Sequence, residues 1–331
     1  MAILRPACPV AYHYRPEELA VPPAFTCTTL YVVGGMYGNP YALDAVVARA
    51  STEPSPPEIV FNGDFHYLDI APDAFRAVDD GVRAHHATQG NIEYALSADD
   101  DTLGCGCDYP DYVTDAVVAG SNAVVAQLRT ARAIIDGHPW LAELPRYLTV
   151  AVGDNRVGIV HGDPENLAGW SLALEAIEPQ DAQIRDRTGF TGTPTPGVRV
   201  LDWLRRADVE VLCCTHTGLP YAQDHPHPEG RGLVVNNGCA GLPNFADRHH
   251  GVLTRLSAHP DAPADSLYGI TLGGLRFDAL PVDYDHDAWA AHFLDTWPPS
   301  TPAHRNYYDR IEHGTWLSPE QAARGSVVCS I

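Results

Sequence analysis

Three consecutive segments near the start of the chain restrict its fold more than any other feature. Residues 29–33 and 58–61 are short apolar runs of the kind that form buried strands. Between them, residues 40–50 carry apolar side chains at helical spacing, and Asn39 before Pro40 is a typical helix start. A strand, a helix and a second strand in this order make a βαβ unit, whose two strands run parallel. The sequence therefore predicts an α/β fold.

The rest of the chain continues this pattern and then changes character. Helical spacing predicts helices over 72–83, 115–135, near 165–177 and near 197–206, whereas apolar runs predict strands over 85–89, 147–152, 156–160 and 209–213. Tight turns such as Gly273-Gly274 then separate predicted antiparallel strands at 232–235, 251–257, 266–272 and 275–282. We expect an N-terminal arm over 1–28, one domain over 29–283 with an insertion at about 95–146, and a C-terminal extension over 284–331.

The charge of the chain excludes several classes of partner. It has 42 acidic residues against 21 basic ones, all of them Arg, which gives a net charge of −21. Such a surface repels nucleic acids and anionic lipids, so neither is expected as a partner. A small anionic substrate would need a local cation, for which a bound metal ion is the simplest source. Without a membrane span, a signal peptide or a disulfide-rich pattern, a cytoplasmic location is expected.

Side chains that bind metals follow four of the predicted strands. Asp64, Asn91, His161 and His216 each stand just after a strand, and 27, 70 and 55 residues separate them along the chain. In open α/β sheets, such strand ends meet in one crevice where ligands bind. Each residue alone also has an ordinary explanation, as a solvated turn or a hydrogen-bonded core histidine. Together, the four predict a shared metal or catalytic site.

The motifs around these residues resemble those of the calcineurin-like metallophosphoesterase family. They are Gly63-Asp64, Gly90-Asn91-x-Glu93, His161-Gly162, Thr215-His216-Thr217-x-x-Pro220 and, as a divergent first motif, the segment 33–43. The resemblance covers about residues 29 to 256. It implies a four-layer αββα sandwich with mixed sheets, a site at the strand ends, and hydrolysis of phosphate monoesters or diesters with two metal ions, often Mn, Fe, Zn or Ni.

The departures from the family pattern affect the two metal sites differently. Gly35 stands where the family has its first Asp, Tyr37 where it has a His, and Gly218 where it has the last His. Ile92 replaces the His that usually protonates the leaving group. The resemblance therefore implies one complete site for a single divalent transition metal ion (Mn, Fe, Zn or Ni), formed by Asp64, Asn91, His161 and His216.

Other residues are candidates for a supporting role. Gly63-Asp64-x-x-Tyr67 matches a motif of purple acid phosphatases in which the Tyr ligates ferric iron, so Tyr67 is a possible extra metal ligand. His66 and Tyr37 are possible proton donors. All three also have a purely structural explanation. Three cysteines lie in loops expected near the site: Cys105, Cys107 and Cys239. They are either reactive or metal-binding thiols, or small buried apolar residues.

These observations favour a metal-dependent hydrolase of a small phosphomonoester or phosphodiester that uses one ion. The expected partner is a small anionic, phosphate-containing molecule, and the oligomeric state is open. Two alternatives remain: a non-catalytic relative that binds or regulates, and a mononuclear metal enzyme of non-hydrolytic chemistry. The second is open because two His and one carboxylate leave coordination positions free for other reactions.

Overall fold

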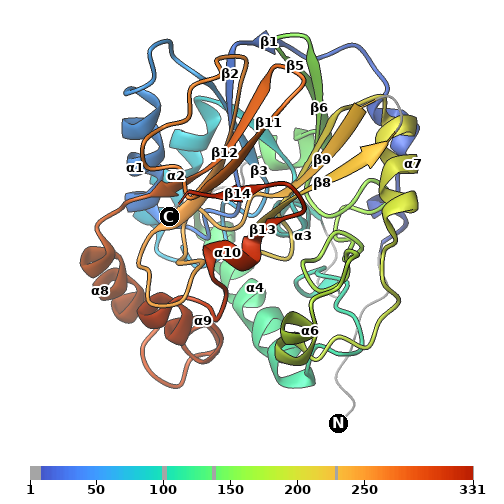
Figure 1. The fold of residues 1–331 in the computed structure, drawn as a ribbon. Helices are drawn as coiled ribbons and strands as arrows, with labels where there is room; N and C mark the ends of the chain where they lie inside the picture. Colours follow the sequence, from blue (N-terminus) through green and yellow to red (C-terminus); the bar gives the residue numbers. More distant parts are fainter. Residues whose placement is uncertain (1–8, 99–102, 136–138, 228–229, 331) are drawn as a thin grey trace.

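The structure, a computed structural model, describes residues 9–98, 103–135, 139–227 and 230–330, and these ranges contain two seven-stranded mixed sheets (Figure 1). In spatial order, the first sheet consists of β14 (Val328–Cys329), β11 (Tyr268–Leu272), β12 (Leu275–Val282), β10 (Gly251–Ser257), β2 (Thr29–Val33), β3 (Glu58–Asn62) and β4 (His86–Thr88). The second consists of β1 (Thr26–Cys27), β5 (Tyr147–Val152), β6 (Asn155–Val160), β7 (Val211–Cys214), β9 (Gly230–Asn236), β8 (Tyr221–His227) and β13 (Ala323–Arg324).

Strand directions agree with the sequence pattern. The strands β2, β3 and β4 run parallel, as the βαβ unit predicts, and β6 runs parallel to β7 in the other sheet. The strands β10, β11 and β12 pair antiparallel, as the turns of the last third predict. Two groups of parallel strands therefore place their carboxyl ends where loops can carry a site.

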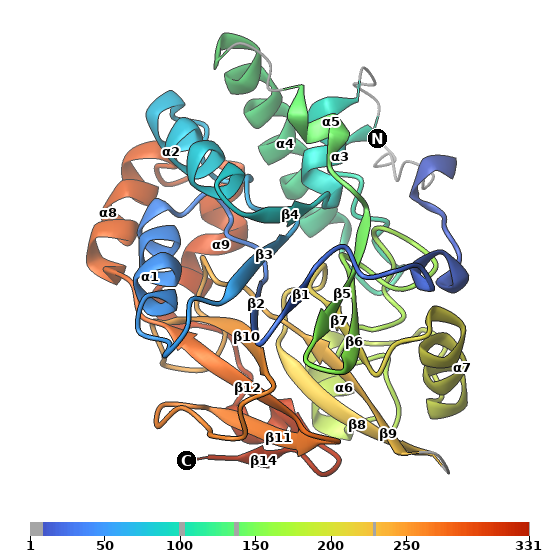
Figure 2. The same cartoon turned by 90° about the horizontal axis from the view of Figure 1, so that it is seen from above.

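Helices lie outside the two sheets and at the strand ends (Figure 2). Those on the side of the first sheet are α1 (Pro40–Ala50), α2 (Pro72–Arg83), α8 (His286–Thr296) and α9 (Pro302–His313). On the side of the second sheet lies α7 (Gly197–Ala207), which contacts the short 3-10 helix η2 (Pro16–Leu19). The remaining helical segments are α3 (Asn91–Ser97), α4 (Asp115–Ile135), α5 (Trp140–Glu143), α6 (Ala182–Thr188), α10 (Pro319–Ala322) and the 3-10 helix η1 (Val10–Tyr12).

The side chains of β2 show how the layers are held together. Leu30 and Val32 are fully buried in a core shared with Ile159 of the second sheet. Their neighbours Tyr31 and Val33 point to the other face and join the core formed with α1 and α2. Because successive side chains of a strand alternate between faces, both faces of this sheet are covered. The four-layer αββα sandwich predicted from the sequence is confirmed.

One predicted helix is wrong. The segment 165–177 forms a series of turns, and the nearest helix, α6, begins at Ala182. The carboxylate of Asp163 accepts hydrogen bonds from the backbone N–H groups of Glu165 and Ser171, at 2.9 and 3.2 Å. Side-chain bonds of this kind compete with helical backbone pairing. The apolar residues that suggested a helical stripe are instead buried inside these turns.

The C-terminal residues contribute to both sheets. The strand β13 pairs with β8 at one edge of the second sheet, and β14 pairs with β11 at one edge of the first. The domain boundaries given above stay a prediction. Among the described residues, no helix combines the length and the apolarity that crossing a bilayer takes.

Candidate metal centre

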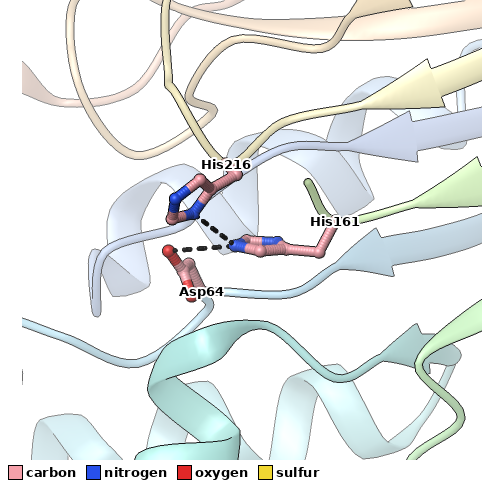
Figure 3. A group of neighbouring side chains, drawn as sticks. All are labelled: Asp64, His161 and His216. Carbon is pink, nitrogen blue, oxygen red and sulfur yellow. Dashed lines mark hydrogen bonds and ion pairs between the residues drawn. The ribbon is translucent and has the colours of Figure 1, made fainter. Parts of the chain in front are cut away.

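The four predicted ligand residues stand at the carboxyl ends of neighbouring strands. Asp64 follows β3 and Asn91 follows β4 in the first sheet, whereas His161 follows β6 and His216 follows β7 in the second. Because each pair of strands runs parallel, their ends lie on the same side of the sandwich. Figure 3 shows the side chains of Asp64, His161 and His216 pointing toward one another across the two sheets.

The candidate ligand atoms are close together. His161 Nε2 lies 3.4 Å from Asp64 Oδ2, 3.1 Å from Asn91 Oδ1 and 3.3 Å from His216 Nδ1. The ligand atoms of Asp64, His161 and His216 all lie within 4.8 Å of one another. The structure thus brings together all four residues that the strand ends singled out.

Backbone carbonyls fix which nitrogen of each imidazole faces the cluster. His161 Nδ1 lies 2.9 Å from the carbonyl of Asn62, and His216 Nε2 lies 3.1 Å from the carbonyl of Cys107. A carbonyl only accepts, so these two nitrogens carry the hydrogen. His161 Nε2 and His216 Nδ1 therefore turn their lone pairs toward the cluster when the rings are neutral.

The remaining two groups also present acceptors. The amide nitrogen of Asn91 donates to the carbonyl of Cys105 at 2.9 Å, which turns its oxygen toward His161. A carboxylate, an amide oxygen and two imidazole nitrogens thus converge, and acceptors at such distances repel one another unless a cation or a proton lies between them. Nitrogen and oxygen donors of this kind fit a divalent transition metal ion.

The electrostatics of the three titratable groups agree with this arrangement. Burial raises the pKa of Asp64, but the neighbouring His161 and His216 lower it below its usual value. Burial and the proximity of His161 lower the pKa of His216 to about 4, so its ring is neutral at pH 7. Burial lowers the pKa of His161, but Asp64 raises it further, and the net shift is upward.

Asn62 joins the two sheets directly beneath the centre, a role that the sequence did not reveal. Its amide nitrogen donates to the carbonyl of Val160 at 2.8 Å, and its amide oxygen accepts from the hydroxyl of Thr88 at 2.9 Å. Its own carbonyl accepts from His161. One buried residue therefore holds the ends of β3, β4 and β6 in fixed relation.

Glu93 positions the loop that carries Asp64. One carboxylate oxygen accepts from the N–H groups of Asp64 and Gly90, at 2.7 and 2.9 Å, and the other accepts from Phe65 and His66, at 3.1 and 3.3 Å. Asp64 itself has φ of 52°, a left-handed conformation that needs such support. The spacing of Glu93 after Gly90 at the start of α3 is the sequence signal for this capping role.

Gly35 and Gly218, which stand at two further ligand positions of the family that the sequence resembles, both lie close to the side chain of Tyr37. A Cβ atom on Gly35 would lie 2.5 Å from Cε2 of Tyr37, too close for any side chain to coexist with the ring. A Cβ on Gly218 would lie 3.5 Å from the Tyr37 hydroxyl and 3.0 Å from the sulfur of Cys239. The Tyr37 ring thus occupies the space between two positions from which family members supply ligands.

His66 does not reach the candidate metal centre. Its Nδ1 lies 2.6 Å from Asp69 and its Nε2 lies 3.4 Å from Asp79, and its ring stacks on Phe75 at 3.8 Å. Both ring nitrogens are therefore occupied in a buried cluster of their own. The suggestion that His66 donates a proton at the centre stays a prediction, and in this structure its ring is held by Asp69, Asp79 and Phe75.

Tyr67 belongs to an aromatic cluster beside the centre. Its hydroxyl accepts a hydrogen bond from Tyr307 at 3.2 Å, and its ring meets the edge of Tyr37 at 5.6 Å. Burial raises the pKa of Tyr67 well above its usual value, so it is a neutral phenol. This environment disfavours the phenolate that would bind ferric iron.

The loop with Cys105 and Cys107 contacts the centre through its backbone. The carbonyls of these two residues accept from Asn91 and His216, as described above. Burial raises the pKa of Cys107 and of Cys239, so both remain thiols rather than thiolates. The structure thus gives the loop an orienting function that residue identity alone does not reveal.

Comparison with known proteins places the fold. No family model and no curated protein matches the chain. Among solved structures, a hypothetical protein, PH1004, from Pyrococcus horikoshii OT3 is similar with a TM-score of 0.56 and 18% identity, over 87% of this chain and 99% of that chain. A metallophosphoesterase from Sphaerobacter thermophilus is similar with a TM-score of 0.48 and 14% identity, over 87% of this chain and 100% of that chain. Similarity at these identities concerns the fold alone: the chain shares its α/β sandwich fold with the Pyrococcus horikoshii protein.

Proposed function

We propose that this protein is a metal-dependent hydrolase of small phosphomonoesters or phosphodiesters. In this proposal, Asp64, Asn91, His161 and His216 hold one divalent transition metal ion (Mn, Fe, Zn or Ni). The observation that carries it is the convergence of four acceptor atoms. Three of the four side chains, those of His161, Asn91 and His216, are oriented by the carbonyls of Asn62, Cys105 and Cys107. Outer hydrogen bonds of this kind orient metal ligands in known sites.

Each residue has a distinct part in the proposed site. Asp64 supplies the negative charge, and His161 and His216 supply neutral nitrogens whose tautomers are already set. When bound, a divalent ion supplies Lewis acidity, which lowers the pKa of water and polarises a phosphoryl oxygen. Because the chain carries a net charge of −21, a local cation is also what attracts an anionic substrate.

The environment of Ile92 restricts the substrate. Its side chain is buried in the apolar core, and its N–H donates to Asp64 at 3.2 Å. The position that family members use for a general acid therefore offers no proton. General acids contribute about 10²–10⁴-fold, so we expect substrates whose leaving group departs without protonation, such as aryl phosphates.

Hydrolysis of p-nitrophenyl phosphate and bis(p-nitrophenyl) phosphate, measured with each of the four metals, tests the proposal. We expect turnover by the wild type and none by His216→Ala, with the same circular dichroism spectrum for both. His250→Ala is the matched control, since His250 is half-buried and, among the described residues, its ring bonds to the backbone carbonyl of Gly251. If no metal supports turnover of either ester, the hydrolase proposal is wrong.

A further inference from the structure

Arg310 brings a positive charge from α9 to the side of the centre where family members have a second metal. Its Nε donates to the carbonyl of Pro243 at 2.8 Å. Its Nη2 donates to the carbonyl of Gly218 at 3.0 Å and to the amide oxygen of Asn244 at 3.3 Å. These three bonds fix the plane and the direction of the guanidinium.

The third nitrogen of Arg310 lies near Gly218, as do the hydroxyl of Tyr37 and the thiol of Cys239. Within the described ranges, Nη1 donates to no oxygen, and it lies 3.6 Å from the point where a Cβ of Gly218 would stand. The hydroxyl of Tyr37 lies 3.5 Å from the same point. Tyr37 in turn donates its backbone N–H to the carbonyl of Asp64 at 3.2 Å. A guanidinium nitrogen and a hydroxyl therefore converge beside the loop of the metal ligand Asp64.

The chemistry of this position suits a phosphoryl oxygen. A guanidinium stays charged at every pH of interest and presents its donors in a plane that matches phosphate geometry. Such charge-assisted bonds are shorter and stronger than neutral ones. In a chain that carries 42 acidic residues, a fixed cation at the site also offsets repulsion of an anionic substrate.

We propose that Arg310 binds a phosphoryl oxygen of the substrate beside the single metal ion, on the side of the centre where Tyr37 and Gly218 stand. This inference rests on the proposed function, since it assumes a phosphate-containing ligand at the same centre. Arg310 Nη1 would contact the oxygen directly, and the hydroxyl of Tyr37 would donate a second hydrogen bond. Guanidinium and metal ion then share the charge of the phosphoryl group.

The same contacts allow Arg310 to be only an anchor that ties α9 to the loops at Gly218 and Pro243. Calorimetric titration of the manganese-loaded protein with inorganic phosphate separates the two roles. The variants are Arg310→Gln, which keeps a donor for the carbonyls but loses the charge, and Arg310→Lys, which keeps the charge. Arg305→Gln on the same helix is the control, because Arg305 is exposed and bonds to the backbone of Ser300. Manganese content and melting temperature are measured for each variant.

We expect Arg310→Gln to bind phosphate about 10–100-fold more weakly than the wild type, the range for loss of a charged hydrogen bond. Arg310→Lys should recover part of that affinity, Arg305→Gln should match the wild type, and manganese content should not change. Equal phosphate affinity for Arg310→Gln and Arg305→Gln, or absence of phosphate binding by the wild type, would overturn the inference. Phosphate binding that depends on Arg310, in a protein that hydrolyses neither ester, would contradict the hydrolase proposal alone.

Discussion

Replacement of Glu93 by Gln tests how the loop of Asp64 is held. Each carboxylate oxygen of Glu93 accepts from two backbone N–H groups, one pair being Asp64 and Gly90 and the other Phe65 and His66. Gln has the same shape, but one oxygen becomes a donor. Whichever oxygen is replaced, two buried N–H groups lose their acceptor and face another N–H.

The expected loss of stability follows from two opposing terms. An unsatisfied buried donor costs about 1–3 kcal/mol, so two cost about 2–6 kcal/mol. Burial and the proximity of Asp64 raise the pKa of Glu93 from 4.5 to about 7, so keeping the carboxylate charged costs about 3 kcal/mol, a cost that Gln avoids. The net effect therefore lies between a gain of about 1 kcal/mol and a loss of about 3 kcal/mol of stability. Metal affinity should decrease more clearly, by about 10–100-fold, because Glu93 orients a ligand.

Metal affinity from competition with a fluorescent chelator and unfolding in urea are the two measurements. Glu175→Gln is the matched control, since Glu175 is also buried and accepts only from the hydroxyl of Tyr112 in the contacts described. It should retain wild-type metal affinity. If Glu93→Gln binds metal as tightly as Glu175→Gln, the loop does not depend on Glu93 and this account of the site is wrong.

Two further predictions concern stability away from the centre. Burial lowers the pKa of His225 to about 4, below the 6.5 expected when unfolded. The unfolded state then binds more protons between these values, so stability should decrease as the pH falls through this window, by at most about 3 kcal/mol. His225→Asn should flatten the dependence measured by urea unfolding at pH 5 and 7, and an unchanged slope would contradict this reasoning. Arg255 is 4% exposed and bonds to Glu53 and Asp278, so Arg255→Met should cost about 3–5 kcal/mol in the same assay. The exposed Arg15→Met should cost less than about 1 kcal/mol, and equal losses would refute the comparison.

The strand ends were predictable because their signals are local. An apolar run followed at once by Asp64, Asn91, His161 or His216 is visible in the sequence, and parallel pairing brings such ends together. The alternation of buried faces that makes a sandwich follows from the same runs. The role of the four residues as ligands stays a prediction, although their side chains converge.

The supporting contacts were not predictable from residue identity. The carbonyls of Cys105, Cys107 and Asn62 orient the ligands, and a backbone carbonyl leaves no mark on the sequence. The position of Arg310 depends on the path of α9, which brings this residue into contact with Gly218 although the two are 92 residues apart in the sequence. The direction of the His66 side chain depends on its contacts with Asp69 and Phe75, which its place in the sequence next to Asp64 does not reveal.

The number of metal ions per chain tests the central claim most directly. The protein is loaded with excess Mn²⁺, passed through a desalting column, and analysed for manganese by mass spectrometry against protein concentration. Because the Tyr37 ring fills the space between Gly35 and Gly218, we predict one ion per wild-type chain and none in His216→Ala. Two ions per wild-type chain, or one ion retained by His216→Ala, would contradict a single-ion centre built on Asp64, Asn91, His161 and His216.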